Sequence, residues 1–353
     1  MELHFNIHDA FRFVVNTPKN NFMKYISKEF DFFKSEKTDS PDLVINIGKF
    51  RPNNAGCSII NNQYFIKKNY LYCRDAYKVV KWEVEFKGIE EGPITVNFNG
   101  NRLADSFLCR YVIEPLMRIR MNENGMAFVH SSGVSDGKNG FLFAASKGVA
   151  KTTTILNLVA EGGIFLSDDF TILSKNGYIH SYPTTVHLFQ YNISAVPAVR
   201  KLLKSRDRMN MVAKNFLYRL SMGYGSLPLN INVSDIFGGS RVGKRYPLKA
   251  FIFLEKSNTG EITIEKIRNT DVSRQIVAIN KLETFNFLDY MLAYTSVFPD
   301  NKLEEHWAKL EETLNKGLYG KPCYKMTVPK VYTPEVLEKI KALLVENGYK
   351  ISS

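Results

Sequence analysis

The pattern of apolar and polar positions predicts a mixed α/β chain with two different parts. Residues 78–87 alternate between apolar and polar side chains, and residues 94–98 repeat this alternation. Alternation with period two is typical of strands that bury one face, so these runs predict an antiparallel hairpin. Residues 105–121 then carry apolar side chains at helical spacing. We therefore predict a smaller N-terminal α+β domain over residues 1–122.

From residue 123 the pattern changes to strand, loop, helix and strand. Residues 140–145 and 164–166 are short apolar runs, and residues 151–161 between them have helical spacing. This order predicts two buried strands joined by a helix in an α/β domain over residues 123–353. The other expected elements are strands at 170–173, 178–182, 248–255, 261–267 and 323–328, basic helices within 196–222, a loop over 223–245, and helices at about 270–283, 286–297, 302–316 and 334–347.

Composition restricts the class of protein. Apolar residues make up 44% and charged residues 23%, close to the average of soluble globular proteins. The sequence has no apolar stretch near the ~18 residues that cross a bilayer, and its first residues do not form a signal peptide. The four cysteines are far apart, without a C-x-x-C pair, which fits a reducing compartment. These features predict a cytoplasmic protein without a membrane partner.

The charge distribution favours an anionic partner. The chain has 47 basic and 35 acidic side chains, which gives a net charge of +12. Residues 191–250 contain eleven Lys or Arg against two Asp and contribute +9 of this charge. The partner could be a nucleotide, a nucleic acid or an acidic protein, and a solvated helix face explains a basic cluster equally well. Nucleic acid is the least favoured partner, because no recognised binding module accompanies the charge.

The segment between the first buried strand and its helix carries the main chemical signal. It reads Ala145-Ser146-Lys147-Gly148-Val149-Ala150-Lys151-Thr152-Thr153. This is the layout of a phosphate-binding loop, G-x-x-x-x-G-K-[S/T], with alanine at both outer glycine positions. Free N–H groups and the dipole at a helix start attract phosphate. Lys151 would contact the β and γ phosphates of a nucleotide, and Thr152 would ligate Mg²⁺.

The glycine and alanine positions set a condition on the backbone of this loop. Gly148 can use a positive φ to turn its N–H groups toward phosphate. Ala145 and Ala150 each add a Cβ where the main chain must approach phosphate. We expect these two alanines to be tolerated only with negative φ.

An acidic pair, Asp168-Asp169, follows the second buried strand. Beside a phosphate loop, one carboxylate can hold Mg²⁺ while the other accepts a proton from an attacking hydroxyl. A turn is the simpler interpretation of an isolated Ser-Asp-Asp sequence. The position of the pair one helix after Lys151 favours the functional interpretation.

These residues resemble a known family. The matching residues are His130, Gly148, Lys151, Thr152, Asp168 and Asp169. In HPr kinase/phosphorylase and similar proteins, a histidine opens a strand, a G-x-S-G-x-G-K-S loop follows, and an aspartate pair comes after one helix. The likeness spans residues 125–192 and, loosely, 248–267. It does not cover the first 120 residues.

The resemblance implies a P-loop kinase domain of the HPr kinase/PEP carboxykinase type, with ATP and Mg²⁺ as cofactors. By position, Lys151 and the loop N–H groups would bind the phosphates, and Thr152 and Asp169 would hold Mg²⁺. Asp168 would be the general base, with His130 beside it to tune it. Gln190 and Tyr191-Asn192 replace the glutamate and the Arg-Gly signature of the bacterial enzyme, which argues against phosphorylase activity and against HPr as substrate.

Arg241 and Arg245 lie in the predicted Gly-rich loop. Their residue type makes them candidates to neutralise charge on a transferred phosphoryl group. We therefore expect an ATP-dependent phosphotransferase that acts on a hydroxyl of a protein, peptide or small molecule. The alternative is a catalytically weakened nucleotide-binding or scaffold protein of the same fold. Assembly into a homo-oligomer stays open.

Overall fold

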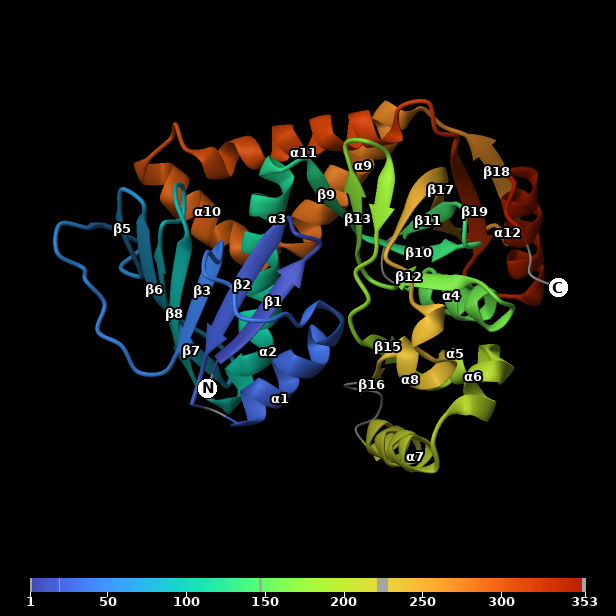
Figure 1. The fold of residues 1–353 in the computed structure, drawn as a ribbon, viewed down its shortest axis with the longest axis horizontal. Helices are drawn as coiled ribbons and strands as arrows, with labels where there is room; N and C mark the ends of the chain where they lie inside the picture. Colours follow the sequence, from blue (N-terminus) through green and yellow to red (C-terminus); the bar gives the residue numbers. More distant parts are fainter. Residues whose placement is uncertain (1, 19, 146–147, 221–227, 351–353) are drawn as a thin grey trace. The chain divides into compact units, whose positions relative to one another are not determined.

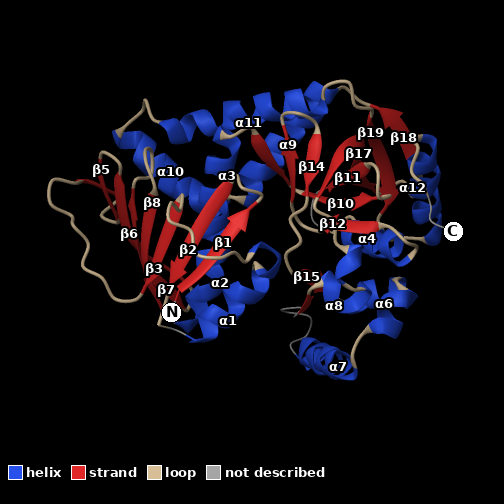
Figure 2. Cartoon of the chain, viewed as in Figure 1, coloured by secondary structure: helices blue, strands red, loops and turns tan. Residues whose placement is uncertain are grey.

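The mixed α/β chain folds into two compact units (Figures 1 and 2). This computed structural model describes residues 2–18, 20–145, 148–220 and 228–350. Unit 1 comprises Met1–Met126 and Asn280–Glu312, and unit 2 comprises Ala127–Ile279 and Thr313–Ser353.

Helix α9 (Asn269–Glu283) leads the chain back into unit 1, and helix α11 (Lys302–Leu318) leads it out again. The domain boundary expected after residue 122 lies near residue 126, where the chain first passes from unit 1 to unit 2. However, a single boundary places residues 280–312 in the second domain, whereas these residues pack in unit 1. Helix α10 (Phe285–Val297) shows why, because Phe287 and Tyr290 pack against Phe86 in the sheet of unit 1.

Unit 1 contains an eight-stranded sheet with strand order β1-β2-β3-β8-β7-β6-β5-β4. The strands are β1 (Glu2–Ile7), β2 (Phe11–Asn16), β3 (Leu43–Ile47), β4 (Ser58–Ile60), β5 (Tyr64–Lys67), β6 (Tyr70–Tyr77), β7 (Val80–Lys87) and β8 (Ile94–Gly100). The remaining helices are α1 (Asn20–Glu29), α2 (Asp105–Leu108) and α3 (Glu114–Glu123), with a π-helical turn at Cys109–Ile113 and 3₁₀ turns at Asp31–Phe33 and Arg102–Ala104. The predicted hairpin is confirmed, because β7 and β8 pair antiparallel.

One face of this sheet is apolar, and its other face carries an unexpected buried carboxylate. Trp82, Val84 and Phe86 of β7 are buried, as the alternation predicts. Glu85, on the opposite face, is also fully buried. Its carboxylate accepts hydrogen bonds from Asn97 Nδ2 at 2.6 Å and Tyr70 OH at 2.9 Å. These donors replace the water that an exposed strand face would provide.

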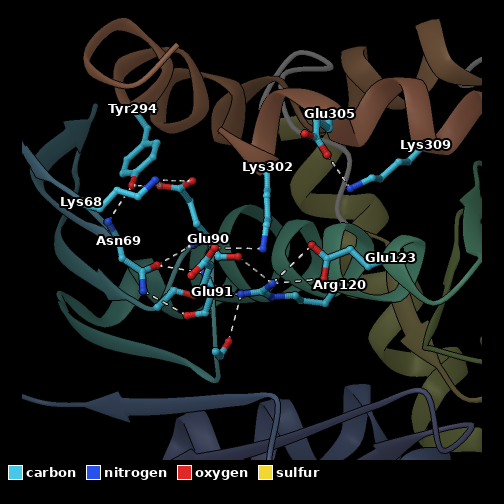
Figure 3. A network of polar contacts seen from close by, with 12 residues as sticks. Lys68, Asn69, Glu90, Glu91, Arg120, Glu123, Tyr294, Lys302, Glu305 and Lys309 are labelled. Atoms are coloured by element: carbon cyan, nitrogen blue, oxygen red, sulfur yellow. Dashed lines mark hydrogen bonds and ion pairs between the residues drawn. The ribbon is translucent and has the colours of Figure 1, made fainter. Parts of the chain in front are cut away.

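A polar network holds the turn between β7 and β8 (Figure 3). Arg120 of α3 donates to the carbonyl oxygens of Gly88, Glu90 and Gly92, at 3.0 to 3.2 Å. The carboxylate of Glu90 accepts from Tyr294 OH of α10 and pairs with Lys68 at 2.9 Å. One guanidinium therefore satisfies three main-chain acceptors of this turn, while Asn69 accepts from its N–H groups.

Unit 2 contains a nine-stranded sheet and a two-stranded one. The strands are β9 (Met126–Val129), β10 (Ser131–Ser135), β11 (Gly140–Ala145), β12 (Ile164–Ser167), β13 (Thr171–Ser174), β14 (Tyr178–His180), β15 (Val186–Leu188), β16 (Leu229–Ile231), β17 (Arg245–Ser257), β18 (Thr263–Lys266) and β19 (Cys323–Pro329). The helices are α4 (Lys151–Ala160), α5 (Gln190–Ala195), α6 (Pro197–Leu202), α7 (Ser205–Leu220), α8 (Val233–Phe237) and α12 (Pro334–Glu346), with a 3₁₀ turn at Gly239–Arg241. The predicted strand–helix–strand order is present as β11, α4 and β12.

The strand directions in this sheet determine where the site lies. β11 runs parallel to β17, and β17 runs parallel to β19. β10 is antiparallel to both β11 and β12, so β12 runs in the same direction as β11. The carboxyl ends of β11, β12, β17 and β19 therefore meet at one edge, together with the start of β10. Ligand sites of open α/β sheets commonly lie at such an edge.

The loop predicted over residues 223–245 needs correction. Residues 223–245 were expected to be a loop, but their described part contains β16, α8 and a 3₁₀ turn. Apolar residues such as Ile231 and Ile236 join the core of unit 2 and stabilise these short elements.

All four cysteines are free thiols. Within the described ranges, no helix is long and apolar enough to span a membrane.

Replacing Arg120 with alanine should destabilise unit 1. The substitution leaves three carbonyl oxygens without their donor, and we expect the free energy of unfolding to fall by about 2 to 4 kcal/mol. Trp82 and Trp307 both belong to unit 1, so tryptophan fluorescence during urea unfolding reports on this unit alone. The matched control is Arg12→Ala, because the only polar contact of the Arg12 side chain within the described residues is an ion pair with the exposed Asp9 at 3.9 Å. Equal urea midpoints for the two variants would contradict this role of Arg120 in holding the turn between β7 and β8.

Candidate active site

The segment between β11 and α4 ends at a lysine that folds back onto the loop. Lys151 is the first residue of α4 and is 7% exposed. Its Nζ donates to the carbonyl oxygen of Ala145 at 2.7 Å. The ammonium group is therefore held inside the loop, at the N-terminus of a ten-residue helix, where the helix dipole also attracts anions. Both sources of positive potential lie at the same point.

The backbone of this loop meets one expectation and contradicts another. Gly148 has a φ of +78°, so the prediction of a positive φ there is confirmed. Ala145 is the last residue of β11 and is extended. Ala150, however, has a φ of +61° and a ψ of 22°, in the left-handed region. The expectation of a negative φ at Ala150 is wrong, and the helix begins from a conformation that an alanine adopts at a cost of roughly 1 to 2 kcal/mol.

The other predicted loop residues divide into three groups. Val149 is buried and belongs to the core of unit 2. Thr153 accepts a hydrogen bond from Asn192 Nδ2 at 3.0 Å, which connects α4 to α5. Ser146 and Lys147 lie outside the described residues.

Asp168 directly follows β12 and is the buried acid of the site, 8% exposed. Thr152 Oγ1 donates to Asp168 Oδ2 at 3.0 Å, and Ser132 Oγ lies 3.2 Å from Asp168 Oδ1. Ser132 also donates to the main-chain oxygen of Asp168. The structure thus brings together residues from the starts of β10 and α4 and the end of β12.

Burial raises the pKa of Asp168 from 3.8 to about 7, and the nearby charge of Asp169 contributes to the rise. Hydrogen bonds from Thr152 and Ser132, and the charge of Lys151, act in the opposite direction. A carboxyl group whose pKa lies near neutrality can both take up and release a proton under physiological conditions. This property distinguishes Asp168 from an ordinary surface aspartate.

His130 lies beside this acidic pair. It is 3% exposed and packs edge-on against Phe170, the residue after Asp169, with 5.0 Å between ring centroids. Asp169 is half-buried and lies close enough to Asp168 for its charge to raise the pKa there. The structure therefore places His130, Asp168 and Asp169 at one edge of the sheet.

Arg241 and Arg245 lie away from this edge. Arg241 donates to the carbonyl oxygen of Gly162, just beyond the C-terminus of α4, and α4 is roughly 15 Å long. Arg245 starts β17 and stacks over the Tyr178 ring at 4.1 Å. Ala145 pairs with Leu254, so Arg245 is roughly 30 Å away along the strand. Residue type suggested these two arginines, but the structure places both away from the site, Arg245 through the register of β17 and Arg241 through its contact with Gly162.

A cation that the sequence did not suggest lies beside the loop instead. Lys256 is exposed near the end of β17, and its Nζ is 3.9 Å from the position that a Cβ on Gly148 would occupy. The preceding residue, Glu255, forms an ion pair with Lys325 at 2.7 Å. Successive side chains of a strand point to opposite faces, so Lys256 faces away from that pair and toward the loop. In the sequence, the signal that could have identified Lys256 was its position directly after the apolar strand predicted at 248–255.

Tyr191 is a second neighbour of the acid. Partial burial raises the pKa of Tyr191, and the charge of Asp168 adds to this rise. Its ring stacks on Phe189 with 5.5 Å between centroids.

The oxygen atoms near the loop suit a hard divalent cation. Thr152 Oγ1 and Asp168 Oδ2 are 3.0 Å apart, and Asp169 contributes a further carboxylate nearby. Mg²⁺ is commonly bound by one or two carboxylates together with substrate phosphates and water. The donor set therefore fits Mg²⁺ bound together with a nucleotide. Among the described residues, no group of three or more His, Cys, Asp or Glu could hold a metal by itself.

No protein-family model and no curated protein matches the sequence. Among solved structures, the HPr(Ser) kinase/phosphatase from Coxiella burnetii is similar, with 13% sequence identity and a TM-score of 0.27. The match covers 62% of this chain and 94% of that chain. It is a weak resemblance of an α/β fold. The function proposed below is based on the geometry of the site.

Glycine at position 150 should stabilise the protein, because glycine adopts the left-handed conformation without a clash. We expect Ala150→Gly to raise the free energy of unfolding of unit 2 by about 1 kcal/mol. Ala145→Gly is the matched control with the opposite sign, since Ala145 is extended and fully buried. Chemical unfolding followed by circular dichroism measures both changes. Destabilisation by Ala150→Gly would contradict the left-handed assignment.

Proposed function

We propose that unit 2 is an ATP- and Mg²⁺-dependent phosphotransferase that moves a γ-phosphoryl group to a hydroxyl of a protein, peptide or small molecule. The observation that carries this proposal is the contact between Thr152, at the start of α4, and Asp168, a buried acid whose pKa is near 7. A phosphate-binding helix start next to a proton acceptor is the minimal arrangement for phosphoryl transfer.

The residues of the chain divide the work in the proposed reaction. Lys151 exchanges the Ala145 carbonyl for phosphate oxygens, and the loop N–H groups bind the same phosphates. Asp168 takes the proton of the acceptor hydroxyl, whose oxygen bonds to the γ-phosphorus while the bond to the β–γ bridging oxygen breaks and ADP leaves. Thr152 and Asp169 hold Mg²⁺, which neutralises phosphate charge when bound.

Lys256 supplies a second positive charge in this proposal. The first cation, Lys151, starts α4, while Lys256 approaches the loop from the neighbouring strand β17. Alanine in place of two loop glycines hinders close approach of the main chain to phosphate. An additional ammonium group near Gly148 offsets part of this loss through charge, which acts over a longer distance than a main-chain hydrogen bond.

A nucleotide-binding or scaffold protein without catalysis is the second candidate. The left-handed Ala150 and the contact between Lys151 and Ala145 favour it, because both must be accommodated or exchanged when phosphate binds. This candidate predicts weak or absent ATP binding in a protein that is otherwise folded. Nucleotide binding and phosphoryl transfer are therefore tested separately.

Asp168→Asn should reduce phosphoryl transfer at least a hundredfold, because asparagine cannot accept the proton. Labelling of candidate acceptors by [γ-³²P]ATP measures transfer, and calorimetry checks that the variant still binds Mg·ATP. Asp235→Asn, an exposed carboxylate on α8, is the control and should behave like wild type. Equal transfer by wild type and Asp168→Asn would remove Asp168 as the base.

The same base predicts a pH dependence. Asp168 is protonated below a pKa of about 7, so kcat/KM should rise about tenfold per pH unit on the acid side and level off above neutrality. Stability should change in the opposite direction. The folded state holds the Asp168 proton more tightly than the unfolded state, so this group's contribution to stability falls as pH rises from about 4 to 7. A flat rate profile between pH 5 and 8 would contradict the assignment.

Lys256→Met should weaken Mg·ATP binding roughly five- to tenfold and leave AMP binding unchanged, because the lost charge faces the distal phosphates. Lys151→Ala should weaken it more. Lys249→Met is the matched control, an exposed lysine on the same strand but toward its other end. Calorimetry gives the dissociation constants. Wild-type protein that binds no Mg·ATP at millimolar concentration would favour the scaffold candidate, whereas tight binding insensitive to Lys256→Met would remove only the role of Lys256.

A further inference from the structure

Helix α7 of unit 2 carries an apolar stripe that faces solvent. Met209, Val212 and Phe216 are 73%, 68% and 61% exposed. Their spacing of three and four residues places them on one face of the helix over two turns. Met211 lies on a different face, is only 4% exposed, and anchors α7 to the core of the unit. The stripe is thus an outward face of a helix that is packed on its other side.

Basic side chains flank this stripe. At roughly 100° per residue, Arg206 and Arg208 fall on opposite sides of it. Both are exposed, as are Arg200, Lys201 and Lys204 just before α7. Within the described part of the chain, none of these five side chains forms an ion pair with a carboxylate. Arg208 instead donates to the main-chain oxygens of Leu203 and Lys201.

The basic residues of the stretch 191–250 therefore do not act as one patch. Arg241 and Arg245 are engaged near Gly162 and Tyr178, at the far end of the sheet from the site. Around α7, the side chains of Arg200, Lys201, Lys204 and Arg206 are exposed, and Arg208 is exposed while it donates to two main-chain oxygens. Figure 1 shows α7 beyond α6 and α8 as seen from the sheet of unit 2. Positive charge and exposed apolar side chains are thus concentrated on the same outer helix.

We propose that the α7 surface, formed by Met209, Val212 and Phe216 with Arg206 and Arg208, binds an acidic amphipathic polypeptide segment. Anchors at spacing i, i+3 and i+7 match the ridges that one helix presents to another. A partner with apolar side chains flanked by Asp or Glu would bury the stripe and pair with both flanks. Methionine adapts to different partner shapes, which suits such a surface.

Charge and the extent of the apolar stripe favour this occupant over two others. A second copy of the chain would bring two surfaces of the same positive charge into contact, where like charges repel. A lipid surface requires a helix with an apolar face along its length, inserted several ångströms into the headgroups. Among the described side chains of α7, the stripe has three large anchors over two turns, which is sufficient for a peptide contact.

The test uses the full chain and three labelled peptides of twenty residues, without nucleotide. The first peptide has Leu at every third or fourth position and Glu elsewhere. The second replaces Leu with Ser, and the third replaces Glu with Lys. Fluorescence anisotropy should show that only the first binds with a dissociation constant in the micromolar range. Because no ATP is present, the outcome does not depend on the proposed phosphotransferase activity.

Two variants identify the surface. The triple substitution Met209→Ser, Val212→Ser and Phe216→Ser should weaken binding of the Leu-Glu peptide at least tenfold while the charge is unchanged. The control removes two exposed apolar side chains elsewhere in unit 2, Tyr319→Ser with Val331→Ser, and should bind like wild type. Equal binding by the triple variant would overturn the proposal. Stronger binding to phosphatidylserine vesicles than to the peptide, or dimerisation lost in the triple variant, would also overturn it.

Discussion

The hydrogen bond from Thr152 to Asp168 is the contact on which the geometry of the site depends. It joins the first turn of α4 to the end of β12, two elements that the chain connects only through the length of the helix. Because the Asp168 carboxyl is desolvated, its charge is unfavourable unless donors and cations surround it. Ser132 and Lys151 converge on the same group for this reason. The hydroxyl groups of Thr152 and Ser132 and the charge of Lys151 thus compensate for the burial of the Asp168 carboxyl.

Two buried carboxylates of the chain show how local partners decide the charge state. Burial would raise the pKa of Glu85, yet hydrogen bonds from Asn97, Lys87 and Tyr70 hold it below its usual value. Burial also acts on Asp168, but there the neighbouring carboxylate of Asp169 adds to the effect and raises the pKa. Glu85 is thereby kept ionised as a structural acceptor. The pKa of Asp168 is instead raised to about 7, which suits the proton acceptor of the proposed reaction.

The site also departs from local conformational preference. Ala150 adopts a left-handed conformation that glycine would adopt without strain, and the buried ammonium group of Lys151 contacts a main-chain oxygen. Folded proteins concentrate such unfavourable choices where function demands a particular geometry. The strand that leads into the loop supplies the compensation, because β11 pairs with β10 on one side and β17 on the other and is buried along its whole length. The strain is confined to a few residues.

The sequence by itself determined the features that depend on neighbours along the chain. The hairpin of β7 and β8, the order of β11, α4 and β12, and the positive φ of Gly148 all follow from local periodicity and residue type. The tertiary structure decided what depends on strand register and on the return of the chain. It buried Glu85, moved Arg245 to the opposite edge and brought Lys256 to the loop. Pairing between distant strands fixes these positions, and a linear pattern carries no record of which strands will pair.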